Sequence, residues 1–123
     1  MKLPPPLSAA IVEASKSEHK HRVGAVVTDR GGRILGRGFN QIRGHRWSDL
    51  YEYPEQYHAE TAALLSIRSS RRKPHTIYIA RINRGGLLRL AKPCPHCFQI
   101  INTQNIKKIV YTTEDGVDEV CPV

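Results

Sequence analysis

Apolar residues recur along this chain in short groups that have two different periods. Four groups rich in β-branched and aromatic residues predict strands at 23–28, 33–39, 75–82 and 107–113. The turn Asp-Arg-Gly-Gly joins the first two groups, which favours a β-hairpin. After the third group, "NRGG" turns the chain again, and "LLRLAK" then forms either an antiparallel return or an extended loop.

Three other groups follow the spacing of a helix. After three prolines, Ser8 can cap a first helix, in which Leu7, Ile11 and Ala14 recur at helical intervals. The stretch "HAETAALLSIRSS" is rich in helix-forming residues and predicts a second helix. A third begins near Cys94 or Pro95, because proline suits a first helical turn.

The predicted order α-β-β-α-β-α-β-β is that of an α/β domain with helices packed on a mixed sheet. About ten residues follow "KIVYT", and they include the turn signal "EDG". A parallel crossover needs a dozen or more residues, so a last strand has to return as an antiparallel hairpin partner. Because no repeat or linker interrupts the chain, we expect one domain over residues 1–123.

Composition and charge narrow the class of protein. The 123 residues are 40% hydrophobic and contain no apolar run of the roughly 20 residues that a membrane span requires. The start of the chain lacks the apolar core of a signal peptide, so we expect a cytoplasmic protein. The net charge is +8, from 19 Lys+Arg against 11 Asp+Glu. This balance favours an anionic partner such as a nucleotide, RNA or DNA, although a solvated basic surface is the alternative.

The stretch "PCPHC" (93–97) offers three metal ligands within four residues. A C-x-x-C at a helix start lets Cys94 and Cys97 converge on one ion, while His96 between them points away. The same motif also occurs in redox proteins and in structural zinc sites. A structural site usually needs a second ligand pair, and Cys121 has no such partner nearby. "HAE" at the start of the second helix supplies His58 as a third ligand and leaves Glu60 to hold the proton of a water molecule.

Together, "HAE" (58–60) and "PCPHC" (93–97) resemble the signature of the cytidine/deoxycytidylate deaminase superfamily of zinc enzymes. The resemblance implies a three-layer α/β/α fold with a mixed five-stranded sheet. It implies Zn²⁺ held by His58, Cys94 and Cys97, with Glu60 as the catalytic acid and base. Zinc lowers the pKa of a water molecule, which attacks C4 of a cytosine or C6 of an adenine, and ammonia leaves.

The resemblance also implies substrate contacts. Asn40 matches the family's sugar-binding asparagine, and the backbone groups of Ala59 and Pro93 are expected near the reacting amine. Val23 and Ala25 either line the base pocket or belong to the core.

Basic and aromatic side chains are concentrated in the loop 41–57. Arg43 and Arg46 could bind a phosphate, and Trp47 could stack on a base. The same residue types suit single-stranded nucleic acid or an interface between subunits. Because most relatives are oligomers, we expect a homo-oligomer.

Two features point to different subfamilies. His58 in the ligand set resembles deoxycytidylate deaminases, tRNA adenosine deaminases, guanine deaminases and polynucleotide cytosine deaminases. The hairpin end instead resembles free-cytidine deaminases or toxin-like ones. The leading hypothesis is a deaminase of a cytosine nucleoside or nucleotide, with the deoxycytidylate type favoured. The alternatives are a deaminase acting within RNA or single-stranded DNA, and a non-catalytic zinc-stabilised nucleic-acid-binding module.

Overall fold

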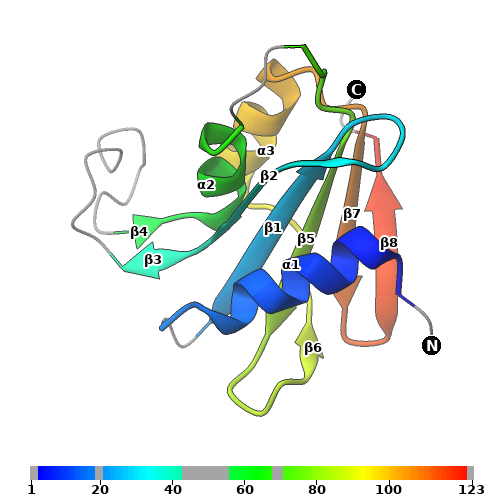
Figure 1. Cartoon of the computed structure of the whole chain (residues 1–123). Helices are drawn as coiled ribbons and strands as arrows, with labels where there is room; N and C mark the ends of the chain where they lie inside the picture. Colours follow the sequence, from blue (N-terminus) through cyan, green and yellow to red (C-terminus); the bar gives the residue numbers. More distant parts are fainter. Residues whose placement is uncertain (1–2, 19–20, 43–55, 68–70, 122–123) are drawn as a thin grey trace.

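The computed structural model describes residues 3–18, 21–42, 56–67 and 71–121 (Figure 1). Its elements in chain order are α1 (Pro5–Ser15), β1 (Arg22–Thr28), β2 (Ile34–Phe39), β3 (Gln41–Ile42), β4 (Gln56–Tyr57), α2 (Ala59–Leu65), β5 (Thr76–Ile82), β6 (Leu88–Arg89), α3 (Pro95–Thr103), β7 (Lys108–Thr113) and β8 (Gly116–Val120). Among these residues no helix is both long enough and apolar enough to cross a bilayer.

The main sheet is mixed, as predicted, and has the strand order β2-β1-β5-β7-β8. Strand β1 is antiparallel to both β2 and β5, whereas β5 and β7 are parallel. Strand β8 returns antiparallel to β7, which confirms the predicted hairpin at the end of the chain. The short β6 adds a sixth strand to the five expected, because "LLRLAK" begins as an antiparallel return along β5.

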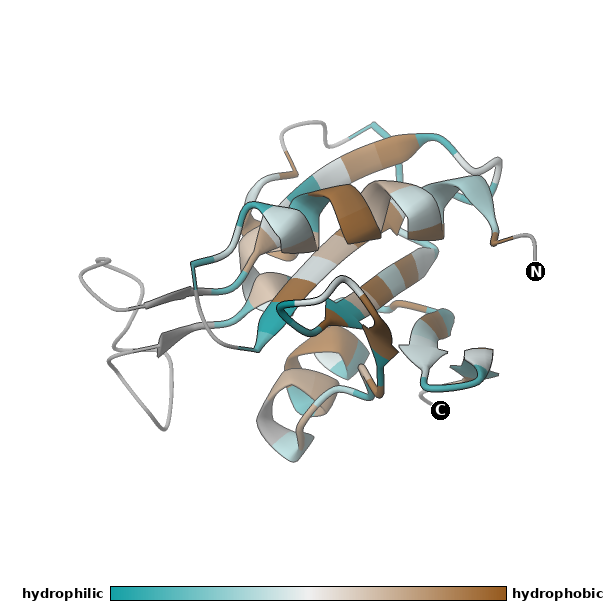
Figure 2. Cartoon of the chain, turned by 90° about the horizontal axis from the view of Figure 1, so that it is seen from below, coloured by the Kyte–Doolittle hydropathy of each residue, from teal (hydrophilic) through white to brown (hydrophobic). Residues whose placement is uncertain are grey.

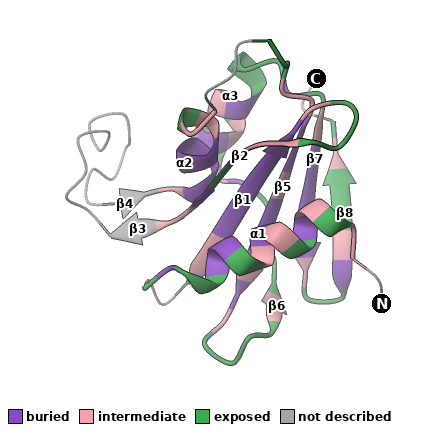
Figure 3. Ribbon diagram, in the orientation of Figure 1, coloured by how far each residue is buried: buried purple, intermediate pink, exposed green. Residues whose placement is uncertain are grey.

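Helices cover both faces of the sheet, so the layers follow the predicted α/β/α order (Figure 1). Successive strand residues point to opposite faces. Val26 and Ala80 therefore pack with α1 on one face, while Ala25 and Ile79 join α2 and α3 on the other. Figure 3 shows the buried residues concentrated in the central strands, and Figure 2 shows hydrophobic segments where helices meet the sheet. The sheet thus has a separate core on each face.

Glycines in β1 and β2 let the helices approach the sheet closely. A Cβ atom on Gly24 would overlap the backbone of α1 at Ala10 and Ala14. A Cβ atom on Gly38 would lie 2.6 Å from the Cβ atom of Ala62 and 2.7 Å from the nitrogen of Ala63 in α2. Only glycine allows these approaches, so these two positions determine how close each helix lies to the strands.

Three boundaries differ from the sequence predictions. Helix α1 begins at Pro5 with Pro4 as its N-cap, so Ser8 lies inside the helix. The prolines suit this first turn because its N–H groups have no helical partner. Helix α2 ends at Leu65, where the hydroxyl group of Ser66 donates to the carbonyl of Ala63. The two ends of the segment 41–57 pair with each other as strands β3 and β4.

Candidate metal centre

The N-terminus of α3 brings two cysteines to one side of a turn. Cys94 is the N-cap, and its sulfur accepts a hydrogen bond from the backbone nitrogen of Cys97 at 3.5 Å. Pro95 occupies the first turn, where a missing N–H leaves nothing unpaired. Cys97 is buried and Cys94 is half-buried. The two thiols therefore face the same small volume, as the C-x-x-C spacing predicts.

His58 reaches this volume from the start of α2. It precedes the helix in an extended conformation as the N-cap residue. Its Nδ1 atom lies 3.1 Å from Sγ of Cys97 and 3.9 Å from Sγ of Cys94. The ligand atoms of the three residues all lie within 4.8 Å of one another. The structure thus brings together the three residues that the sequence analysis proposed as ligands.

This donor set fits zinc. Zinc sites commonly combine imidazole nitrogen with thiolate sulfur in tetrahedral geometry, and tetrahedral bond lengths separate such a nitrogen and sulfur by about 3.6 Å. The two observed nitrogen–sulfur distances, 3.1 and 3.9 Å, lie on either side of that value. Among the described residues these three are the ligands that cluster, and a zinc ion held by three protein ligands keeps one position open, as in catalytic rather than structural zinc sites.

Burial gives the site its electrostatic character. Desolvation raises the pKa of the Cys97 thiol strongly, and the nearby Glu60 carboxylate raises it further. A divalent cation acts in the opposite direction, because metal coordination stabilises the thiolate. The site therefore favours a cation as the partner of its two sulfurs.

Glu60 lies in the first turn of α2 and is 6% exposed. Burial raises the pKa of its carboxyl group, while a backbone hydrogen bond and a hydrogen bond with Cys97 lower it. The same hydrogen bond places the carboxyl group beside the ligand cluster. A buried carboxyl group with a raised pKa at this position can accept a proton and return it.

The predicted contact residues occupy different environments. Ala59 and Pro93 are buried next to the ligands His58 and Cys94 in the chain. Ala25 is fully buried in the core cluster that contains Ala59, and Val23 is partly buried against that cluster. Both alanines thus contribute to the core, whichever further role they have.

Asn40 uses its side chain to join the ends of β1 and β2. Its Oδ1 atom accepts from the backbone nitrogen of Val23 at 2.9 Å, and its Nδ2 atom donates to the carbonyl of His21 at 2.6 Å. An amide has two N–H groups and two lone pairs, so one of each remains for another partner. The side chain is therefore held at the strand ends and keeps capacity for a ligand.

Several other predicted residues cannot be placed. Arg43, Arg46 and Trp47 lie outside the described residues, and so does the side chain of His96. Cys121 is exposed and does not belong to the ligand cluster.

Sequence reasoning missed Thr112, which is fully buried at the end of β7. Its hydroxyl group accepts from the backbone nitrogen of Arg81 at 3.0 Å and donates to the carbonyl of Arg89 at 2.8 Å. Its own carbonyl accepts from the nitrogen of Ala91 at 2.9 Å. Thr112 thus fixes the segment that leads to Cys94. The only signal in the sequence was a pair of threonines at the end of an apolar strand.

Comparisons with known proteins agree with this geometry. The family model for the cytidine and deoxycytidylate deaminase zinc-binding region matches residues 6–113. Among solved structures, cytidine deaminase from Mycobacterium leprae is similar, with 18% identity and a TM-score of 0.63, over 92% of this chain and 88% of that one. The dCMP deaminase from cyanophage S-TIM5 in apo form has 22% identity and a TM-score of 0.64, over 90% and 86%. At these identities the likeness shows the fold. No curated protein sequence matches the chain.

Proposed function

The chain belongs to the cytidine and deoxycytidylate deaminase family, and we propose that it catalyses the zinc-dependent hydrolytic deamination of a cytosine nucleoside or nucleotide, with a deoxycytidylate-type substrate favoured. One observation carries this proposal. The buried Glu60 lies beside the cluster of His58, Cys94 and Cys97, which leaves one zinc position open. A site that only stabilised the fold would need neither the acid nor the open position.

The reaction replaces the amino group on C4 of cytosine by the oxygen of water. His58, Cys94 and Cys97 would hold the zinc ion, which supplies a Lewis acid that makes water nucleophilic near neutral pH. Glu60 takes a proton from the attacking water and delivers it to ring nitrogen N3. It then transfers the second water proton to the amino group, which leaves as ammonia when the C4–N bond breaks. The ring that remains is uracil.

Other residues would orient the substrate. The backbone groups of Ala59 and Pro93 flank the ligands on the two helices, where they can contact the amino group. Asn40 has one N–H and one lone pair beyond its two backbone bonds, which suits a sugar hydroxyl group. Val23 and Ala25 would limit the depth of the base site. Arg43, Arg46 and Trp47 remain predicted substrate contacts.

One observation favours a second candidate. The net charge of +8 suits a polyanion, so deamination of cytosine or adenine within RNA or single-stranded DNA is the alternative. The third hypothesis is a zinc-stabilised nucleic-acid-binding module without catalysis. It does not explain why the carboxyl group of Glu60 is buried beside the ligand cluster. The S-TIM5 dCMP deaminase has also been solved in complex with dCMP and dUMP, which supports a mononucleotide for a chain of the same fold.

A substrate panel tests the proposal. Zinc-loaded protein is incubated with dCMP, dCTP, cytidine, deoxycytidine, guanine and short DNA or RNA oligomers, and released ammonia and product are measured. We expect turnover of a cytosine nucleoside or nucleotide. Turnover of oligomers alone would replace the proposal by its second candidate, and no turnover with one bound zinc would support the third.

The Glu60→Gln variant tests the assignment of the acid and base. Gln has nearly the same shape but cannot take up a proton, so we expect normal zinc content and a loss of turnover of at least about a hundredfold. Glu18→Gln is the matched control. It makes the same chemical change at a glutamate that is exposed and lies outside the ligand cluster. Turnover retained in Glu60→Gln would remove Glu60 from the mechanism.

We also propose that the protein is a cytoplasmic homo-oligomer. The native mass, measured by light scattering at several protein concentrations, tests the oligomeric state. A single mass equal to the 13.9 kDa chain would reject the oligomer.

A further inference from the structure

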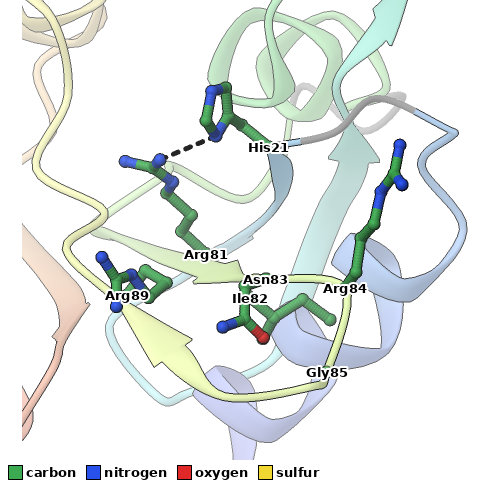
Figure 4. A pocket seen from close by; sticks show the side chains of 7 residues that line it. All are labelled: His21, Arg81, Ile82, Asn83, Arg84, Gly85 and Arg89. Carbon is green, nitrogen blue, oxygen red and sulfur yellow. Dashed lines mark hydrogen bonds between the residues drawn. The ribbon is translucent and has the colours of Figure 1, made fainter.

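A basic hollow of about 570 Å³ opens beside the hairpin formed by β5 and β6 (Figure 4). Three guanidinium groups line it, from Arg81, Arg84 and Arg89, together with His21 and Asn83. No carboxylate is among the described residues that line it. The hollow therefore concentrates positive charge at one place on a chain that is already strongly basic.

The arrangement of two of these arginines is unfavourable on its own. Arg81 and Arg89 lie directly opposite each other in the antiparallel pair of β5 and β6. Like charges in such cross-strand positions destabilise a sheet. The ion pair of Arg89 with Glu114, at 3.6 Å, joins two well-exposed side chains and contributes little. An anion between the guanidinium groups would remove the repulsion.

Hydrogen bonds hold two of the lining groups, Arg81 and Asn83, in place. The guanidinium group of Arg81 lies 2.8 Å from Nδ1 of His21 and donates to the carbonyl of Leu90 at 3.5 Å. These two bonds use two of its five N–H groups. Oδ1 of Asn83 accepts from the nitrogen of Leu87 at 3.0 Å, which leaves its NH₂ group as a donor. Several fixed donors and positive charge suit the oxygens of a phosphate group.

The hollow lies where β5 ends, next to the segment that leads to the metal centre. Arg81 pairs with Val23, so its side chain is on the face of the sheet that packs against α2 and α3. Leu90, bonded to Arg81, precedes Cys94 by four residues. Even a fully extended chain puts those two Cα atoms no more than about 14 Å apart. The carbonyl of His21, which also lines the hollow, accepts a hydrogen bond from Asn40, so the hollow adjoins the residue proposed to contact the sugar.

We propose that this hollow binds a phosphate group of the nucleotide whose base is deaminated at the metal centre. The inference rests on the proposed function and makes it more specific, because the protein then selects phosphorylated substrates over free nucleosides. The arginines proposed to contact the phosphate lie on the β5–β6 hairpin.

The test compares dCMP with deoxycytidine. The double variant Arg84→Gln/Arg89→Gln removes two charges, and both side chains are exposed, so the fold is retained. Arg30→Gln/Arg33→Gln is the matched control, because these exposed arginines lie in the turn between β1 and β2. We expect the ratio of kcat/KM for dCMP to that for deoxycytidine to fall roughly tenfold to a hundredfold in the first variant. The ratio stays unchanged in the control.

A binding measurement separates this inference from the proposed function. In a Glu60→Gln background, calorimetry gives the affinities for dCMP, deoxycytidine and inorganic pyrophosphate. A selective loss of dCMP affinity in Arg84→Gln/Arg89→Gln supports the inference, even if no turnover is found. Loss of pyrophosphate binding alone would mean an anion site unconnected to the substrate and would overturn it. An unchanged dCMP affinity, or a loss confined to oligonucleotides, would overturn it as well.

Discussion

Replacing Gly38 by Ala tests how closely α2 lies against β2. The added Cβ atom would lie 2.6 Å from Cβ of Ala62 and 2.7 Å from the nitrogen of Ala63, whereas ordinary contacts begin at 3.4 Å. Helix α2 must therefore move outward by about 0.8 Å at this point, because one of the two neighbours is backbone and cannot change rotamer. The substitution changes the distance between two elements rather than the chemistry of the site.

The magnitude follows from two opposing effects. Overpacking costs about 1–3 kcal/mol. The smaller conformational freedom of Ala in the unfolded chain returns about 0.4–1 kcal/mol. We expect a net loss of about 1–2 kcal/mol, which lowers Tm by roughly 4–8 °C for a domain of this size. His58 and Glu60 begin the same helix, and zinc tolerates ligand shifts of only about 0.2 Å. Zinc affinity therefore falls as well.

Thermal unfolding by circular dichroism and zinc competition with a chromophoric chelator measure both effects. Gly31→Ala is the matched control, because its Cβ atom would meet nothing nearer than Oδ1 of Asp29 at 3.5 Å. That variant should have an unchanged or slightly higher Tm. If Gly38→Ala unfolds at the same temperature as Gly31→Ala and binds zinc equally well, α2 does not lie against Gly38 as described.

Three further outcomes follow from the structure. Thr112→Val keeps the shape of the side chain but leaves the nitrogen of Arg81 without its acceptor, so a urea titration should show a loss of about 1–3 kcal/mol. Removal of zinc by a strong chelator should lower Tm. Free zinc at a thousandfold above its Kd stabilises the native state by about 4 kcal/mol, and this stabilisation is lost. Cys94→Ser should lose the bound zinc measured by atomic emission, while Cys121→Ser should retain one equivalent. Equal zinc content in these two variants would contradict the ligand cluster.

Most elements of the fold could be predicted because their signals are local. The β1–β2 hairpin has a strand rich in β-branched residues before a Gly-rich turn, and α3 has a proline in its first turn. The antiparallel pairing of β7 with β8 could be predicted because the turn signal "EDG" directly follows the strand. The predicted N-cap of α1 was wrong. Serine has a strong capping preference, but the prolines before Ser8 already suit the first helical turn, so the helix begins earlier.

The metal centre was also predictable, whereas the residues around it were not. His58, Glu60, Cys94 and Cys97 have side chains whose chemistry is rare enough to identify by spacing. Thr112 and Arg81 act through tertiary contacts between β5, β6 and β7, and no periodicity in the sequence pairs them. The sugar contact of Asn40 stays a prediction, and its two bonds to the backbone of His21 and Val23 depend on strand register, which the sequence does not reveal.

The separation of the three ligands along the chain affects the order of events during folding. Cys94 and Cys97 are three residues apart, so an unfolded chain can already capture zinc with both thiolates. His58 is 36 residues before Cys94, so bringing it to the two cysteines requires closure of a loop that contains α2, β5 and β6. Zinc therefore binds the unfolded chain to some extent, which reduces its net stabilisation of the native state. The metal would bind the two cysteines first. It would gain His58 as its third ligand when α2 and α3 come together.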